Sequence, residues 1–172
     1  PSRGLGDVYK RQVVAFVTSR YTMDAKDSTV RRYLAQRAEL LGAIRLPNDA
    51  FKKNAGAEVV SDIIFLQKRD RPLDIVPEWT QTGQTEDGFA INRYFIDHPE
   101  MVCGEMQMVS GPYGMRSACV PNEQSPLAEQ LDAALSNLHA DYTLVDEQEY
   151  AEEESGTIDA DPNVRNFSYT VK

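Results

Sequence analysis

Two apolar runs, separated by a helix-like stretch and a short third run, constrain the fold of this 172-residue chain more than any other feature. Residues 13–19 and residues 59–66 have the length and the β-branched content of buried strands. The first run is apolar on both faces, as in a parallel sheet covered by helices. A short strand over Ala43–Leu46 lies between them and ends at Pro47, which cannot donate to a sheet ladder. The sequence therefore predicts an α/β architecture.

The stretch between the first two predicted strands favours one amphipathic helix. Asp27 or Ser28 can cap its start, and Gly42 is a natural stop. Its apolar stripe consists of Val30, Tyr33, Leu34, Leu40 and Leu41. Its opposite face carries Arg31, Arg32, Gln36, Arg37 and Glu39. We therefore expect a helix that buries the stripe and exposes the arginines.

The loop that follows the second predicted strand carries an unusual set of side chains. It opens with Pro47 and Asn48, continues with Phe51, Lys52 and Lys53, and remains polar up to the third strand. Loops at strand ends are where α/β proteins place their binding and catalytic residues. We therefore expect functional side chains in this loop.

The remainder of the chain predicts shorter and less regular elements. Residues 75–140 favour an irregular α+β extension with short helices and turns, including a turn at residues 111–114 between strand-like pieces and a helix over Pro126–His139. Residues 141–172 predict an acidic linker that leads to a downstream domain. Between Asp141 and Asp161 there are nine acidic residues and no basic one, which is typical of a solvated segment.

Charge is distributed unevenly along the chain. Residues 13–74 hold 11 lysines and arginines against 8 acidic residues, whereas residues 75–172 hold 4 against 18, so the net charges are +3 and −14. The first part can face a polyanion, and the second part would be repelled by one. We therefore expect any contact with nucleic acid to involve residues 13–74.

Several other classes of protein and site are disfavoured. Cys103 and Cys119 lack the spacing of a disulfide framework or a zinc site, so we expect buried or half-buried free thiols in a reducing compartment. His98 and His139 have no partner at metal-ligand spacing. No apolar stretch approaches the ~18 residues that a membrane helix needs, and no secretory signal is evident. The expectation is a cytoplasmic protein without a metal site.

Two further patterns favour a structural role over a functional one. Asp62 lies within an apolar run, and we expect its carboxylate to bond backbone groups near a strand end. The methionines 101, 106, 108 and 115 are expected to fill the core, because methionine adapts to irregular gaps.

Residues 2–12 resemble the in-frame translation of a transposase-based sequencing adaptor. We therefore expect residues 1–12 to be adaptor-derived and the natural protein to begin upstream of Val13. The Gly4-Leu5-Gly6 sequence receives no nucleotide-binding role, because no predicted strand precedes it and no third glycine follows at the required spacing.

Three segments of the chain resemble one protein family. Phe16–Tyr21, Gly42–Phe51 and Ser61–Arg69 are similar to the C-terminal half of the catalytic domain of S-adenosylmethionine-dependent DNA N6-adenine methyltransferases. The similarity is closest to the modification-subunit type of restriction-modification systems, and especially to large methylase–helicase proteins of bacterial mobile elements. Shorter segments within residues 92–115 and 160–164 resemble the same group. The resemblance places the expected protein in a bacterial cytoplasm.

The resemblance implies a partial Rossmann-like methyltransferase sheet. Its three strands would be the fifth, sixth and seventh of the family's sheet, with the last inserted antiparallel between the other two, and residues 13–74 would form the distal part of the catalytic domain. The glycine-rich cofactor loop and the family's Asn/Asp-Pro-Pro-aromatic tetrad have no counterpart in the sequence. The resemblance therefore implies no catalytic or cofactor-binding residue in this chain and no activity of the chain alone, with S-adenosylmethionine as the cofactor of the parent protein.

The resemblance also implies roles for the loop after the second strand. Phe51 matches the aromatic residue that stacks on an adenine flipped out of the duplex, with Pro47 and Asn48 beside it as substrate-binding residues. Lys52 and Lys53 would contact the phosphates of double-stranded DNA. The alternatives are a core position for Phe51 and a solvated turn for the two lysines.

Two hypotheses follow for the parent protein. In the first, it is an adenine-specific DNA methyltransferase fused to a helicase domain, and it transfers a methyl group to a flipped adenine. In the second, these residues form a non-catalytic spacer or DNA-binding scaffold between the methylase and helicase domains. The acidic character of residues 75–172 favours the second hypothesis for that region.

Overall fold

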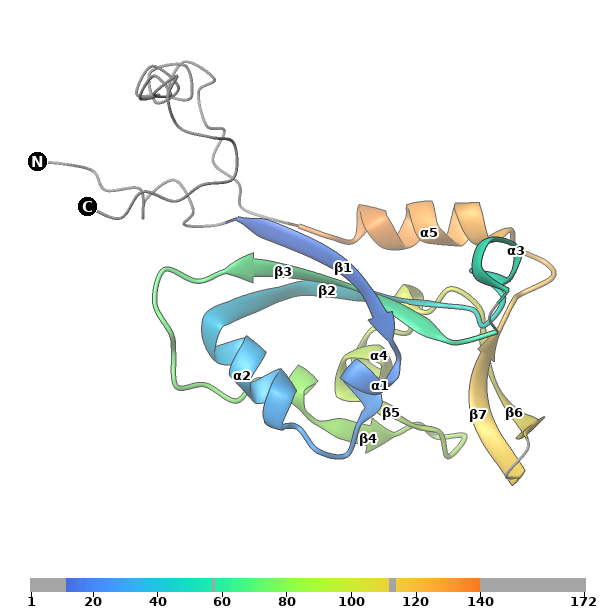
Figure 1. Ribbon diagram of the computed structural model, residues 1–172, viewed down its shortest axis with the longest axis horizontal. Coiled ribbons are helices and arrows are strands. Elements are labelled where there is room, and N and C mark those ends of the chain that lie inside the picture. The colour runs from blue at the N-terminus through green and yellow to red at the C-terminus, as the bar shows by residue number, and fades with distance from the viewer. Residues whose placement is uncertain (1–11, 57, 112–113, 140–172) are drawn as a thin grey trace, which may run out of the picture. The chain divides into compact units, whose positions relative to one another are not determined.

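The principal sheet of the computed structural model has three strands, β1 (Val13–Ser19), β2 (Ala38–Leu46) and β3 (Ser61–Lys68) (Figure 1). Strand β3 lies between β1 and β2 and pairs antiparallel with both, so β1 and β2 run in the same direction. This order and these directions agree with the sequence-based expectation for the three strands. The architecture is mixed α/β with small antiparallel sheets, whereas the Rossmann-like assignment stays a prediction.

The structure describes residues 12–56, 58–111 and 114–139. Most of the predicted adaptor-derived segment and the whole acidic linker lie outside these described residues. The described residues belong to one compact unit that ends near residue 142, so the predicted distal domain and its extension fall within the same unit.

Strand β1 is more exposed than the sequence analysis predicts. Among the described residues its only strand partner is β3, which leaves it at an edge of the sheet. Val13, Val14 and Val17 are exposed by 40%, 46% and 53%. The expectation of a strand covered on both faces is therefore wrong for the described residues, because apolar composition predicts a strand without specifying its neighbours.

The predicted helix is shorter than expected and buries a different face. The predicted helix corresponds to α2, which covers Thr29–Arg37 and ends where strand β2 begins at Ala38. A separate short helix, α1, covers Tyr21–Asp24 before it. Val30 and Tyr33 of the predicted apolar stripe are exposed, whereas Arg31 of the predicted polar face is 1% exposed. The helical pattern failed here because tertiary contacts override a weak local propensity.

Gly42 lies inside β2 instead of ending a helix. The register of β2 against β3 shifts between Leu40 and Gly42, which marks a bulge. A side chain at Gly42 would collide with the side chain of Leu138, which follows helix α5 (Leu127–Ser136). The glycine therefore permits close packing rather than a helix stop.

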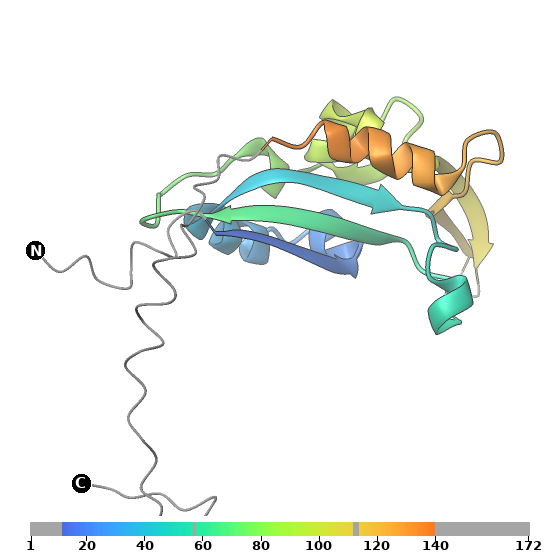
Figure 2. The same ribbon diagram turned by 90° about the horizontal axis from the view of Figure 1, so that it is seen from above.

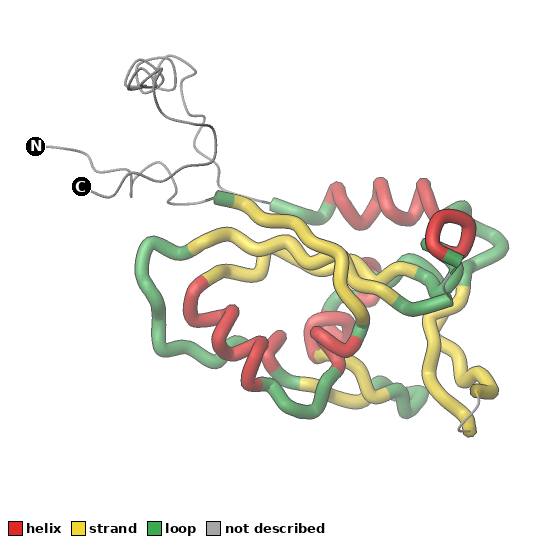
Figure 3. Tube along the Cα trace, in the orientation of Figure 1, coloured by secondary structure: helices red, strands yellow, loops and turns green. Residues whose placement is uncertain are grey.

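The remaining elements are short and follow the irregular pattern that the sequence predicts for residues 75–140. They include a two-stranded sheet (β4 with β5), an antiparallel hairpin (β6 with β7) and a C-terminal helix (Figures 1 and 3). Their bounds are α3 Lys52–Ala55, η1 Glu78–Thr80, β4 Thr82–Gln84, β5 Ala90–Asn92, α4 Arg93–Asp97, η2 Pro99–Met101, β6 Glu105–Gly111, β7 Gly114–Val120 and α5 Leu127–Ser136.

The main core joins the sheet to the later elements. Ile44 and Ile64 of the sheet lie in one buried cluster with Ile91, Phe95 and Met101 of the extension. Helix α5 runs beside β2, on the side of the sheet away from β1 (Figure 2). No helix among the described residues is long and apolar enough to cross a membrane.

Two smaller predictions have mixed outcomes. Both cysteines are buried free thiols, as expected. Met101 is buried and Met106 is packed against the core, but Met108 and Met115 are 52% and 63% exposed. Those two lie on the β6–β7 hairpin, most of whose residues are exposed or half-buried, so the expectation of core filling is wrong for them.

Candidate functional site

A small cleft lies where β1 and β2 end. Its cavity has a volume of about 80 Å³ and is lined by residues 19–21 after β1, Asn48 after β2, residues 58–60 before β3 and residues 116–118 of β7. Three of these segments come from the predicted distal domain, and the fourth comes from the extension. Because β3 is inserted antiparallel, its first residues lie at the same end of the sheet as the last residues of β1 and β2.

Hairpin β6–β7 closes one side of the cleft. Ala118 and Cys119 of β7 form a second buried cluster with Val60, and the Asn48 backbone N–H donates to the Cys119 carbonyl at 2.8 Å. These contacts hold β7 against both loops that flank the cleft. The extension therefore contributes residues of β7 to the cleft at this end of the sheet.

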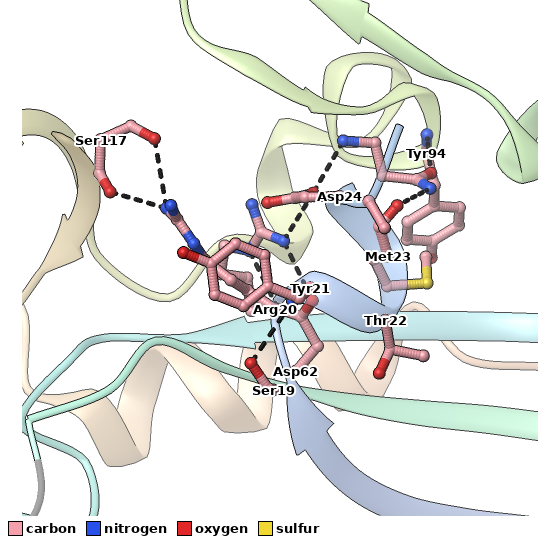
Figure 4. A network of polar contacts seen from close by, with 12 residues as sticks. Ser19, Arg20, Tyr21, Thr22, Met23, Asp24, Asp62, Tyr94 and Ser117 are labelled. Carbon is pink, nitrogen blue, oxygen red and sulfur yellow. Dashed lines mark hydrogen bonds and ion pairs between the residues drawn. The ribbon is translucent and has the colours of Figure 1, made fainter. Parts of the chain in front are cut away.

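Arg20 crosses the cleft to β7. Its Nη1 donates to the Ser117 carbonyl at 2.6 Å and contacts the Ser117 Oγ at 3.2 Å, and Figure 4 shows the two side chains pointing toward each other. The Arg20 guanidinium carbon is also 5.2 Å from the centre of the Tyr21 ring. Tyr21 is 66% exposed. The cleft thus presents a positioned guanidinium beside an exposed aromatic ring.

A buried charge cluster lies beneath the strand ends. Arg45 of β2 binds Asp62 of β3 through two parallel hydrogen bonds of 2.9 Å, and its Nη2 is 3.0 Å from Asp24 of α1. The guanidinium also lies 4.3 Å from the centre of the Phe95 ring. Arg45 and Asp62 are fully buried. The cluster joins α1, β2, β3 and Phe95 of the extension.

The electrostatics of the cluster follow from burial and pairing. Burial acts to lower the pKa of Arg45, but the carboxylates of Asp62 and Asp24 hold it above its usual value. Burial raises the pKa of Asp62, and the Arg45 guanidinium offsets part of that effect. The sequence-based expectation for Asp62 is wrong in its partner, because the carboxylate bonds the Arg45 side chain and not the backbone.

The predicted substrate-binding residues are not all at the cleft. Asn48 lines it. Pro47 is fully buried, and Phe51 is half-buried and packs against the main core; neither lines the cleft. The stacking role of Phe51 stays a prediction, and its packing is also what the core alternative requires.

The predicted DNA-contacting lysines are exposed on α3, the short helix after the loop. Lys52 forms an ion pair with Glu58 across the loop, and both side chains are more than half exposed. A hydrogen bond from Lys52 lowers the pKa of Glu58, and the same bond raises the pKa of Lys52. Lys53 is exposed as well. A phosphate that binds Lys52 would have to compete with Glu58.

The cleft residues that sequence reasoning missed include Arg20, Tyr21 and Arg116. Arg20 and Tyr21 fall within a segment that carries the family resemblance, but their position at a strand end was not used as a signal. Arg116 is far away in sequence, in a region whose net charge argues against polyanions. Only the pairing of β6 with β7 and the packing of β7 bring Arg116 to this edge.

Comparison of the chain with protein-family models, with curated proteins and with solved structures gave no significant match.

Proposed function

We propose that this chain is the distal part of the catalytic domain of a DNA adenine-N6 methyltransferase, of the type that is fused to a helicase. The observation that carries the proposal is the insertion of β3 antiparallel between β1 and β2. The family resemblance implies this strand order, whereas the apolar pattern of the three strands alone does not predict it. Because of this insertion, the loop after β2 and the end of β1 lie at the same end of the sheet.

The open edge of β1 supports the same proposal. Exposed valines on an edge strand without charged residues are unusual, because such strands pair readily with other strands. In the proposed domain, further strands of the sheet cover this edge. The proposal therefore explains an exposed apolar strand that a self-contained domain would normally protect.

In the proposed reaction, S-adenosylmethionine supplies the methyl group and a flipped adenine receives it. The cleft does not fit the cofactor, because its volume of about 80 Å³ is well below the roughly 300–1,000 Å³ of typical small-molecule sites. The proposal places the cofactor with the glycine-rich loop and the catalytic tetrad, in the other part of the domain. The residues of this chain contribute to binding and orienting the substrate.

Phe51 remains the proposed stacking residue for the flipped adenine. Flipping costs a few kcal/mol, and base–aromatic stacking is worth roughly 1–3 kcal/mol. Phe51 is only half-buried, so part of the residue is accessible to solvent. Pro47, being buried, would shape the loop from below, while Asn48 at the cleft could contact the substrate.

Two activity measurements test this proposal. The 172-residue chain, incubated with S-adenosylmethionine and adenine-containing duplex DNA, is expected to show no turnover. In a full-length relative that carries the same loop, Phe51→Ala is expected to lower both the methylation rate and the affinity for a flipped base. Turnover by the chain alone would contradict the fragment assignment, and an unchanged rate and affinity would contradict the stacking role.

The spacer hypothesis remains the second candidate, and the charge of residues 75–172 favours it for that region. The spacer hypothesis predicts that the residues lining the cleft do not contact DNA. Nuclease footprinting of the full chain on duplex DNA, compared with Lys52→Gln and Lys53→Gln variants, separates the two candidates. Protection that depends on these lysines supports the methyltransferase proposal, and no protection at low salt supports the spacer.

A further inference from the structure

We propose that the cleft at the ends of β1 and β2 is a nucleotide subsite of a bound DNA strand. In it, Arg20 and Arg116 hold one backbone phosphate, and Tyr21 stacks on the adjoining base. This inference rests on the proposed function and deepens it, because it assigns residues that the resemblance does not.

The size and charge of the cleft suit a single phosphate. A cavity of about 80 Å³ is too small for a nucleoside or a cofactor but has room for a compact charged group. Two arginines line it, and its one carboxylate, Glu58, is already paired with Lys52 outside the cleft. Guanidinium groups bind phosphate with strong and directional hydrogen bonds.

Arg20 is held in place before any ligand arrives. Its Nη1 is fixed by the carbonyl and the hydroxyl of Ser117, while among the described residues no partner binds its Nε or Nη2. The Arg116 side chain makes no hydrogen bond within the described part of the chain, and Glu58 is a charge in its vicinity. One arginine is thus preorganised and the other is free to close on an anion, which lowers the ordering cost of binding.

Tyr21 is the aromatic residue best placed for a base next to that phosphate. Its side chain is 66% exposed and lines the cleft, with the Arg20 guanidinium beside its ring. Phe51, by contrast, is packed against the core and does not line the cleft. An exposed ring beside a phosphate-binding arginine is the arrangement by which proteins hold single-stranded nucleic acid.

The first test uses the full chain and measures binding by NMR titration with AMP, adenosine and inorganic phosphate. AMP is expected to bind more tightly than adenosine or phosphate. Tyr21→Ala should weaken AMP binding about fivefold or more, and Tyr21→Phe should retain it. Arg116→Gln should weaken AMP and phosphate but not adenosine. Binding of AMP no tighter than of its two parts would overturn the subsite.

The matched control is Tyr33. It is also an exposed tyrosine with a neighbouring arginine, since the Arg37 guanidinium carbon lies 3.7 Å from its ring centre, but it does not line the cleft. Arg71 is an exposed arginine that does not line the cleft, and Tyr33→Ala and Arg71→Gln are both expected to leave AMP binding unchanged. An equal loss in Tyr33→Ala and Tyr21→Ala would show unspecific stacking and overturn the proposal.

The second test distinguishes a strand from a free nucleotide. A short, fluorescein-labelled, adenine-containing single strand should bind more tightly than AMP, and Arg116→Gln should reduce the slope of log affinity against log salt by about 1. Tighter binding of AMP than of the strand would overturn the assignment to DNA. These readouts do not involve methylation, so the subsite can stand even where the methyltransferase assignment fails.

Discussion

Two ion pairs at the same end of the sheet behave as opposites. Arg45 and Asp62 are both fully buried and joined by two hydrogen bonds of 2.9 Å, whereas Lys52 and Glu58 are 60% and 54% exposed. The charge types are the same, but solvent screens only the second pair. The buried pair therefore fixes the relation of β2 to β3, while the exposed pair governs only what the loop surface offers to a ligand.

The comparison teaches where this chain tolerates change. A buried charge that loses its partner remains desolvated, so the penalty falls on the folded state. An exposed charge that loses its partner is solvated again at once. We therefore expect the buried cluster to control folding and the exposed pair to control binding.

The largest effect is expected at Asp62. Asp62→Ala leaves the Arg45 guanidinium buried with only Asp24 as a partner, and should lower the free energy of unfolding by about 3–5 kcal/mol. Urea unfolding followed by circular dichroism measures this change. The double variant Arg45→Met/Asp62→Leu should remain destabilised, because it leaves the nearly buried Asp24 carboxylate without its Arg45 partner. A loss below about 1 kcal/mol in the single variant would break the comparison.

The next largest effect is expected at Arg31. This buried arginine donates to the carbonyls of Thr22, Ala25 and Thr80, and so ties α1 and α2 to the extension. Arg31→Ala should lower the free energy of unfolding by about 2–3 kcal/mol, since hydrogen bonds of a charged group are lost and buried carbonyls are left unpaired. Arg32, its exposed neighbour, is the control, and Arg32→Ala should change stability little. Equal losses in both variants would contradict this role.

Burial should also make stability depend on alkaline pH through Cys119. Burial raises the pKa of its thiol from 9.0 to about 12. A pKa that is higher in the folded state stabilises it below pH 9, and this contribution is lost as the pH rises from about 9 to about 12. Between pH 8 and pH 10 the loss from this group should be about 1 kcal/mol. Urea unfolding should show that loss in the natural chain and less of it in Cys119→Ala; identical pH profiles would contradict the assignment.

The smallest effect on stability is expected at the exposed pair. Glu58→Gln should leave the urea midpoint unchanged within error, because both side chains are solvated. The same change frees Lys52 and should increase affinity for duplex DNA at low salt, measured by fluorescence anisotropy. Lys52→Gln is the control and should decrease that affinity. A large shift of the urea midpoint in Glu58→Gln would contradict the expectation that the exposed pair, unlike the buried pair, contributes little to stability.

The sequence predicted the three principal strands, the hairpin around residues 111–114 and the C-terminal helix. These elements are specified by local signals: β-branched runs, a turn signal and a proline near the start of α5. The boundary between α2 and β2 could not be predicted, because residues 38–41 have a helical apolar pattern and residues 38–40 pair with β3 only in the folded chain. The burial of Arg31 could not be predicted either, because an amphipathic helical pattern places arginines on the solvent-exposed face.

The candidate site was predictable only in part. The sequence indicated the loop after β2, and Asn48 of that loop does line the cleft. Arg116 could not be predicted, because it reaches the cleft only through the packing of β7 against Val60 and Asn48, which are far from it in sequence. Asp62 was noticed as a polar residue in an apolar run, but its partner Arg45 follows from the β2–β3 register.

The most direct test of the account grafts residues 13–139 into a full-length adenine-N6 methyltransferase of the resembling group, in place of its own distal segment. The measurement is methyl transfer from S-adenosylmethionine to adenine in duplex DNA, with folding and cofactor binding of the graft checked beforehand. The account predicts that the graft methylates DNA and that Phe51→Ala within it impairs methylation. A graft that folds and binds the cofactor but transfers no methyl group would contradict the account.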